Sequence, residues 1–333
     1  MLRKVRRRML GISPREVSFS VRGFHLGDHE TRSRLEAAGA AFVRGYQLAL
    51  DIGEPEHVGR VIDATEGRAR ASLARGADTD HGGGGRADGI GFVFEGAAMA
   101  LSLLDALSPI PGDRLARFRE GPAARSVYTV NVGVGWALAR LPRWRWRPLL
   151  CRLDPLLGWL AWDGYGFHQV FFHPREPVRA PLPGYVAHAT AQGAGRALWF
   201  FCCGDADLVA GEVRRYRPEF HGDVWSGVGL AATYAGGPQD HVTRLPRLAG
   251  AHAPALAQGA AFAAKARIRL GVPPAHTEAA TLALAGVGSA EAAAVTDRVL
   301  AGLAGHTGPV PAYEEWRRRV ARELTTTGSS HVA

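Results

Sequence analysis

The sequence has little cysteine and no long uninterrupted apolar run. Its three cysteines include the adjacent Cys202 and Cys203, and no C-x-x-C spacing occurs, so they predict no disulfide framework. A reducing, cytoplasmic setting is the simpler expectation. No apolar run reaches the roughly 18 residues that cross a bilayer. No signal-peptide pattern follows the basic segment Met1–Met9. We therefore expect no transmembrane segment.

Lysine is almost absent. It occurs only at Lys4 and Lys265, so arginine supplies nearly all of the net charge of +9. Most arginines are dispersed and form no long basic stripe, and we therefore expect no nucleic-acid partner. We interpret the remaining arginine runs as solvated faces or tails. They are Arg3–Arg8, for which weak attraction to anionic lipid is a minor alternative, Arg140–Arg147 and Arg317–Arg319.

Motifs for common cofactors and nucleophiles are also missing. Gly133-Val-Gly135 and Gly227-Val-Gly229 lack the strand that precedes a dinucleotide-binding G-x-G-x-x-G turn. Ser226 lies in W-S-G-V-G, which is not the G-x-S-x-G elbow of hydrolases. The two histidines His168 and His173 are five residues apart and do not share a helix face as a metal-binding pair would. The sequence therefore predicts neither a cofactor nor a metal.

The apolar pattern predicts an all-α fold with few or no strands. Leu35, Ala38 and Phe42 recur at three- and four-residue spacings, as on one face of a helix. The C-terminal hundred residues are rich in alanine, which favours helix intrinsically. Residues 127–141 are the exception, because the β-branched and aromatic residues of their first half are compatible with extended structure.

A short motif occurs twice: Asp88-Gly-Ile-Gly-Phe92 returns as Asp163-Gly-Tyr-Gly-Phe167. Residues 125–133 also align with 196–204, and 224–231 resemble 93–100 more loosely. Such self-similarity predicts duplicated helical hairpins around one apolar core. The expected organisation is a basic N-terminal segment 1–29, one helical-repeat domain 30–325 and a tail 326–333. Within the domain we expect pseudo-repeats at about 30–145 and 146–240, then an Ala-rich part 241–325.

Four titratable residues within or beside apolar stretches are the catalytic candidates. Glu95 is either a general acid or base with a raised pKa, or a cap in the first turn of a helix. His168 is either a proton-transfer group or a core histidine with satisfied hydrogen bonds. Asp163 has helix capping or a turn as its default role. Asp223 opens a helix beside His221, and there the functional and capping interpretations are equally open.

Aromatic residues gather between residues 136 and 201. Beside a few polar groups, an aromatic wall suits a long apolar or conjugated ligand, although an ordinary core would have the same composition. Asn131 stands in an apolar run and needs a partner. The substrate-binding candidates are Trp225, Tyr165, Phe167, Trp136, Tyr128 and Asn131.

Five segments of the chain together resemble the UnbL-type family. They are Phe92–Ala100, Gly133–Pro142, Leu153–Leu157, Asp163–His168 and Asp223–Ala231. This is a domain-of-unknown-function family from actinomycete enediyne biosynthesis clusters, and the resemblance spans nearly the whole chain. It implies a part in maturing a polyene into the enediyne core, or in a carbon–carbon coupling of that core to an anthraquinone partner. It carries over no catalytic residues.

Two hypotheses follow from the residues and the resemblance together. The first is a cofactor-independent enzyme that acts on an apolar, conjugated polyketide intermediate in an aromatic-lined cavity. The second is a non-catalytic binding or chaperone protein that sequesters this intermediate or assists a partner enzyme. Other proteins of the same pathway, or a second copy of the chain in a homodimer, are further expected partners.

Overall fold

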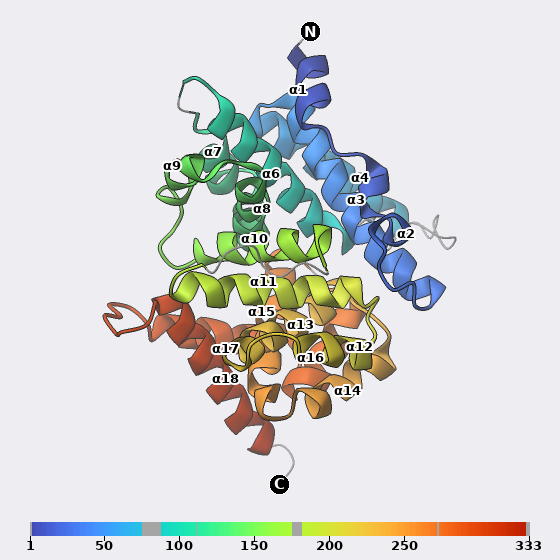
Figure 1. Cartoon of the computed structure of the whole chain (residues 1–333), viewed down its shortest axis with the longest axis vertical. Coiled ribbons are helices and arrows are strands. Elements are labelled where there is room, and N and C mark those ends of the chain that lie inside the picture. The colour runs from blue at the N-terminus through green and yellow to red at the C-terminus, as the bar shows by residue number, and fades with distance from the viewer. Residues whose placement is uncertain (1, 75–87, 111, 175–181, 272, 331–333) are drawn as a thin grey trace.

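The computed structural model describes residues 2–74, 88–110, 112–174, 182–271 and 273–330. Regular structure in these ranges is helical, with no strand among them, which confirms the predicted all-α fold (Figure 1). Residues 127–141 are no exception, because α8 (Val127–Arg140) occupies almost all of this segment. The β-branched residues there are buried against neighbouring helices, and this packing overrides their weak preference for extended backbone.

Seven helices form a stack in which each helix packs on the next one of the set (Figure 1). They are α3 (His29–Ile52), α6 (Ile90–Leu107), α8, α10 (Trp159–Phe172), α11 (Tyr185–Phe201), α13 (His221–Ala235) and α15 (Ala253–Arg269). Further helices pack around the stack: α4 (Pro55–Ala74), α7 (Arg114–Glu120), α9 (Trp146–Leu150), α12 (Ala206–Val213), α14 (Gln239–Ala249), α16 (Ala275–Ala285) and α17 (Ser289–Ala301). Helix α18 (Ala312–Ser330) ends the described chain.

The N-terminal segment lies along α3. It contains α1 (Leu2–Leu10), a 3-10 turn at Pro14–Val17 and α2 (Phe19–Arg22). The hydroxyl of Tyr46 donates to the carbonyl of Leu10 over 2.6 Å, and Arg3 and Arg7 both pair with Asp51. Although these arginines are largely exposed, they help to fasten α1 to α3.

Paired glycines bring the helices of the stack unusually close. Gly164 faces the backbone of Val132 in α8, and Gly166 faces the backbone of Thr190 in α11. Residues two apart in a helix point in nearly opposite directions. One G-x-G pair therefore allows both neighbouring helices to approach closely, one on each side. The same arrangement recurs at Gly133 and Gly135, at Gly193 and Gly195, and at Gly227 and Gly229.

A glycine in a helix costs about 1 kcal/mol relative to alanine. Here each glycine removes a Cβ that would overlap the backbone of the facing helix. Close backbone approach gains dispersion and Cα–H···O contacts, which offset that cost. The abundance of glycine in an all-helical chain therefore has a packing cause.

The two D-G-x-G-F copies are not structurally equivalent. Gly89 is the N-cap residue of α6, whereas Gly164 lies in the middle of α10. The equivalent of Gly164 in α6 is Gly96, which faces α3. The looser sequence similarity between residues 93–100 and 224–231 does pair structurally equivalent positions, since it aligns Gly96 with Gly227. The predicted boundaries of the pseudo-repeats stay a prediction.

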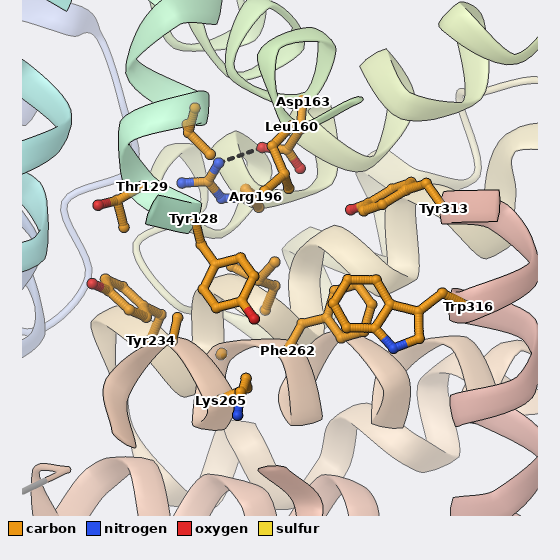
Figure 2. Close-up of a pocket in the computed structure, with 14 residues that line it drawn as sticks. Tyr128, Thr129, Leu160, Asp163, Arg196, Tyr234, Phe262, Lys265, Tyr313 and Trp316 are labelled. Carbon is orange, nitrogen blue, oxygen red and sulfur yellow. Dashed lines mark hydrogen bonds and ion pairs between the residues drawn. The ribbon is translucent and has the colours of Figure 1, made fainter. Parts of the chain in front are cut away.

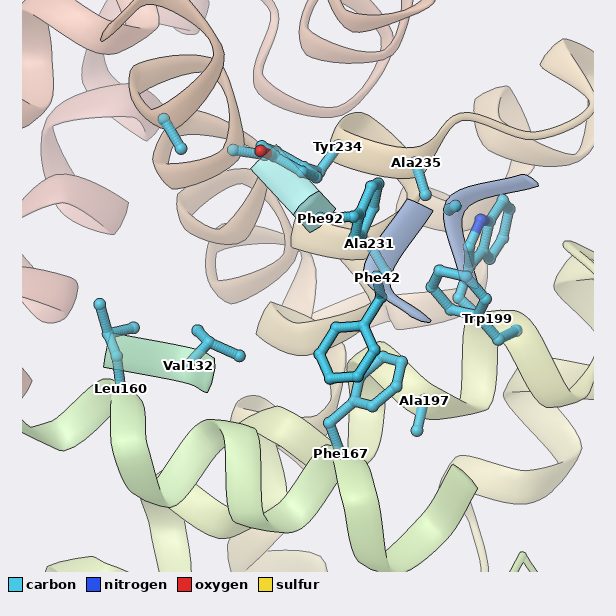
Figure 3. Packing of buried hydrophobic residues seen from close by; sticks show 14 of the residues in the cluster. Phe42, Phe92, Val132, Leu160, Phe167, Ala197, Trp199, Ala231, Tyr234 and Ala235 are labelled. Carbon is cyan, nitrogen blue, oxygen red and sulfur yellow. The ribbon is translucent and has the colours of Figure 1, made fainter. Parts of the chain in front are cut away.

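The stack curves until its last helices meet α6. The ring of Tyr234 in α13 meets the ring of Phe92 in α6 at 5.3 Å, edge to face (Figure 3). Arg267 in α15 donates to the backbone carbonyls of Tyr234 and Asp88. The core of the molecule therefore lies inside a bend formed by α6, α8, α10, α11, α13 and α15.

Helix α6 is the central element of this core. Its length and mean hydropathy would allow it to cross a membrane, and a bent pair, α16 with α17, passes the same test jointly. However, 83% of α6 is buried inside the protein, as in the core helix of a packed domain.

Candidate functional site

In five helices of the stack, a polar residue stands immediately before the glycine that faces the preceding helix of the stack. Its side chain projects between the two sides of the helix that face the neighbouring helices. It points toward the interior of the bend and is buried. These residues are Glu95, Asp163, Gln192, Ser226 and Gln258, whereas α8 has Val132 at this place. A buried polar group needs a partner, and the partners here come from one another and from two arginines.

Arg196 of α11 is the centre of the first polar cluster. Its guanidinium hydrogen-bonds Asp163 and lies 4.0 Å from Glu95, and all three side chains are almost fully buried. Gln192 donates to the other Asp163 oxygen over 2.8 Å and to the hydroxyl of Tyr313 over 3.1 Å. Burial alone would lower the pKa of Arg196, but the charges of Asp163 and Glu95 outweigh it, and the guanidinium stays protonated.

Glu95 is the least satisfied member of this cluster. Its Oε1 accepts a hydrogen bond from the indole of Trp136 over 2.9 Å, and its Oε2 has no hydrogen-bond partner among the described residues. Burial raises the pKa of Glu95 to about 7, against the opposing effect of Arg196. A carboxyl group with this pKa is suited to both giving and taking a proton near neutral pH.

Two aromatic-lined cavities meet at Arg196. The first encloses about 550 Å³ between its atoms, including its opening to solvent, and is lined by α8, α10, α11, α13, α15 and α18. In Figure 2 the Asp163–Arg196 pair lies at one end and Lys265 at the other, with the ring of Tyr128 between them. Phe262 and Trp316 supply the apolar wall. This first cavity lies inside the bend of the stack.

The second cavity encloses about 500 Å³, including its opening to solvent, and Glu95 lines it. Its wall is almost wholly apolar and includes Trp136, Phe167 and Phe171. Ile12, Glu16 and Val17 of the N-terminal segment also line it. Arg196 thus has Glu95 in one cavity and Asp163 in the other.

Three tyrosines line the first cavity, and burial raises the pKa of each. Tyr313 is hydrogen-bonded to Gln192, but the fully buried hydroxyl of Tyr234 has no partner among the described residues. An orphaned hydroxyl costs free energy unless something else binds it. Tyr234 therefore offers a free hydrogen-bonding group to a molecule in this cavity.

The structure separates the four catalytic candidates. Glu95 and Asp163 are brought together by Arg196, whereas Asp223 lines a different, polar cleft. His168 of α10 contacts the ring of Trp136 of α8 but lines neither of these two cavities nor that cleft. Burial lowers the pKa of His168 to about 3, so it is uncharged and weakly basic at neutral pH.

The capping interpretations of Glu95 and Asp163 are wrong. Both residues lie within helices, at the sixth residue of α6 and the fifth residue of α10, and both side chains are buried. The alternative interpretation of Glu95, a carboxyl whose apolar surroundings raise its pKa, agrees with its geometry.

Only some of the six substrate-binding candidates line a cavity. Tyr128 lines the first cavity, and Trp136 and Phe167 line the second. Asn131 is fully buried and donates to the carbonyl of Val127, one turn back in its own helix. Trp225 and Tyr165 are buried in the core and line none of these cavities.

Sequence reasoning missed the buried arginines Arg196 and Arg317, which hold the two carboxylates Asp163 and Asp223. Arg317 was grouped with Arg318 and Arg319 as a solvated run, but it is only 6% exposed and hydrogen-bonds Asp223 over 2.7 Å. Its two neighbours pair with glutamates one turn back in α18. The signal for Arg196 was present in the sequence, because it follows the polar position Gln192 by one helical turn.

The chain matches one family model over residues 1–79 and 86–324. The family is described as a protein of unknown function, DUF1702. The chain belongs to this family. No curated protein and no solved structure matches it. Within the ranges that the structure describes, no cluster of three histidine, cysteine or acidic side chains is placed to hold a metal ion in this DUF1702 protein.

Proposed function

We propose that this DUF1702 protein is a cofactor-independent enzyme of enediyne natural-product biosynthesis. Its substrate would be an apolar, conjugated polyketide intermediate, held in the aromatic-lined cavities on the two sides of Arg196. The pathway rests on the sequence resemblance alone. The chemistry rests on one observation: Glu95, with a pKa near 7 and an oxygen without a partner, faces an apolar cavity beside a fixed positive charge.

In this proposal Glu95 takes a proton from the intermediate and returns it at another carbon. Arg196 stays charged and stabilises negative charge that develops in the conjugated system, as a fixed charge in a water-poor site does effectively. Asp163 and Gln192 orient Arg196 and do not react. Such proton transfers would prepare either a ring closure or a carbon–carbon coupling to an anthraquinone partner.

The second candidate function is binding without turnover. It is favoured by the saturation of Asp163, whose two oxygens are both held by protein donors. A protein of this kind would shield a reactive polyene from water, or hand it to a partner enzyme.

The decisive experiment uses extract from an enediyne-producing strain that lacks the gene. Wild-type protein is expected to convert an accumulated intermediate into a new species that mass spectrometry detects. Glu95→Gln should slow this conversion roughly 100-fold, as loss of a general acid–base group does. Glu30→Gln on α3 is the matched control, because Glu30 is 83% exposed. Full activity of Glu95→Gln would refute the proposed role of Glu95, and binding without conversion would favour the second candidate.

A further inference from the structure

A second polar cluster lies in the cleft between α11, α13, α15 and α18, apart from the two cavities at Arg196. The cleft encloses about 1130 Å³, including its opening to solvent. His188 of α11 and Asp223 of α13 face each other there, with His188 Nδ1 2.7 Å from Asp223 Oδ2. The side chain of His188 is 38% exposed, so the cleft is reached from solvent.

Asp223 is held by Arg317 from α18. The guanidinium donates to Asp223 Oδ1 over 2.7 Å, and also to Gln258, Tyr185 and Glu314. Burial pushes the pKa of Asp223 upward, but the charge of Arg317 and the hydrogen bonds of His188 and Arg317 outweigh it and lower the pKa. Asp223 is therefore an anion in a fixed position.

This anion orients His188. Since Asp223 accepts the hydrogen of Nδ1, the neutral imidazole has its lone pair on Nε2. Nε2 has no hydrogen-bond partner among the described residues. The ring stacks on Tyr185 at 5.9 Å and meets Phe220 at 5.1 Å, which limits its rotation. A histidine with one nitrogen on a buried carboxylate and the other free is the arrangement that general-base and nucleophilic catalysis use.

We propose that this cleft is a second reaction centre, in which His188 catalyses acyl transfer from a small carboxylic ester or thioester to water. His188 Nε2 takes a proton from water while the water oxygen bonds to the acyl carbon. The carbon–oxygen or carbon–sulfur bond to the leaving group then breaks, and His188 returns the proton to that alkoxide or thiolate. The products are a carboxylic acid and an alcohol or thiol, and no oxidant or reductant is needed.

The charged residues around His188 have different roles in the proposed reaction. Arg318 also lines the cleft, and although it pairs with Glu314, its positive charge favours the negative oxygen that forms on the acyl carbon. Asp223 and Arg317 are positioning residues, because they act through His188. The hydrogen bond to Asp223 raises the pKa of His188 above its ordinary value, Glu314 adds to this, and burial and Arg317 oppose it. Glu219 is the remaining titratable group that lines the cleft.

The test uses para-nitrophenyl acetate, an activated ester whose hydrolysis releases a coloured phenolate. Wild-type protein should accelerate the release, and His188→Gln should lower the protein-dependent rate roughly 100-fold. The matched control is His57→Gln, because His57 is exposed on α4 and should leave the rate unchanged. Circular dichroism checks that each variant is folded.

The pH profile separates a positioning role of Asp223 from a structural one. The rate for wild-type protein should rise with pH around a midpoint above 6.5, because the neutral imidazole is the active form. Asp223→Asn should move that midpoint down toward about 6.5, the value of an unperturbed histidine. Equal rates for wild type and His188→Gln would overturn the proposal, as would an unchanged midpoint in folded Asp223→Asn. Since Glu95 lies in another cavity, Glu95→Gln should leave this esterase rate unaltered, which keeps the two proposals separable.

Discussion

The indole of Trp136 donates a 2.9 Å hydrogen bond to one oxygen of Glu95, while the other oxygen of that carboxyl group lacks a partner. Trp136 comes from α8 and Glu95 from α6, so the contact between two neighbouring helices fixes the carboxyl group at the wall of the second cavity. A buried carboxyl group satisfied on one side only is costly to ionise.

Glu95 should contribute a loss of wild-type stability as pH rises from about 4.5 to about 7. The pKa of Glu95 is raised from 4.5 to about 7 on folding, so the folded state binds more protons than the unfolded state within this window. The corresponding loss of unfolding free energy is about 3 kcal/mol. Glu95→Gln should remove this component. Urea unfolding of wild type and Glu95→Gln at pH 5 and pH 8 measures this contribution to the unfolding free energy. The same change between the two pH values in both proteins would contradict the prediction.

Removing Arg196 should be severely destabilising. Arg196→Ala leaves Glu95 and Asp163 buried without their shared cation, and breaking a buried pair in this way costs roughly 3 to 5 kcal/mol. Arg215→Ala is the matched control on the surface, since Arg215 is 62% exposed and pairs with Glu212, and it should change stability by less than about 1 kcal/mol. The urea midpoints of the two variants test this prediction. Equal midpoints would show that Arg196 does not stabilise the buried carboxylates of Glu95 and Asp163.

The glycine pairs should tolerate no added methyl group. In Gly164→Ala the new Cβ would overlap the backbone of Val132, so either helix must shift, at a cost of about 3 kcal/mol. Gly67→Ala in α4 is the opposite case, because a Cβ there meets nothing within 4 Å and should stabilise the helix by up to about 1 kcal/mol. Thermal unfolding of the two variants should move in opposite directions. A stable Gly164→Ala protein would mean that the close approach of α8 and α10 is dispensable.

The hydroxyl of Tyr234 should be free of any structural role. Tyr234→Phe removes a buried donor that has no partner, so stability should stay the same or rise slightly. Tyr46→Phe loses the hydrogen bond to Leu10 and should cost about 1 kcal/mol. If the first cavity binds the intermediate, Tyr234→Phe should weaken binding without lowering stability. A clear loss of stability in Tyr234→Phe would instead place a partner on this hydroxyl.

The helical periodicity was predictable because it depends on local spacing, and Glu95 was identified because a charged residue in an apolar run is costly wherever it is buried. The partners were not predictable. Arg196 lies 101 residues after Glu95 in the sequence, and only the bend of the stack brings the two together. Arg317 was misassigned because three consecutive arginines look alike in sequence, although a helix turns about 100° per residue and can bury only one of them. The D-G-x-G-F motif misled for a related reason: identical letters occupy a helix start in α6 and a helix centre in α10.

The meeting of Arg267 with the carbonyl of Asp88 has a consequence for how the molecule opens. A linear array of helices can lose its outermost members one at a time while the others keep their contacts. Here the last helices of the stack are fastened to α6, so α15 cannot leave without also exposing the start of α6 and the wall of the first cavity. Amides in α6 and α15 should therefore exchange with solvent deuterium by the same opening event, although α6 ends at Leu107 and α15 begins only at Ala253.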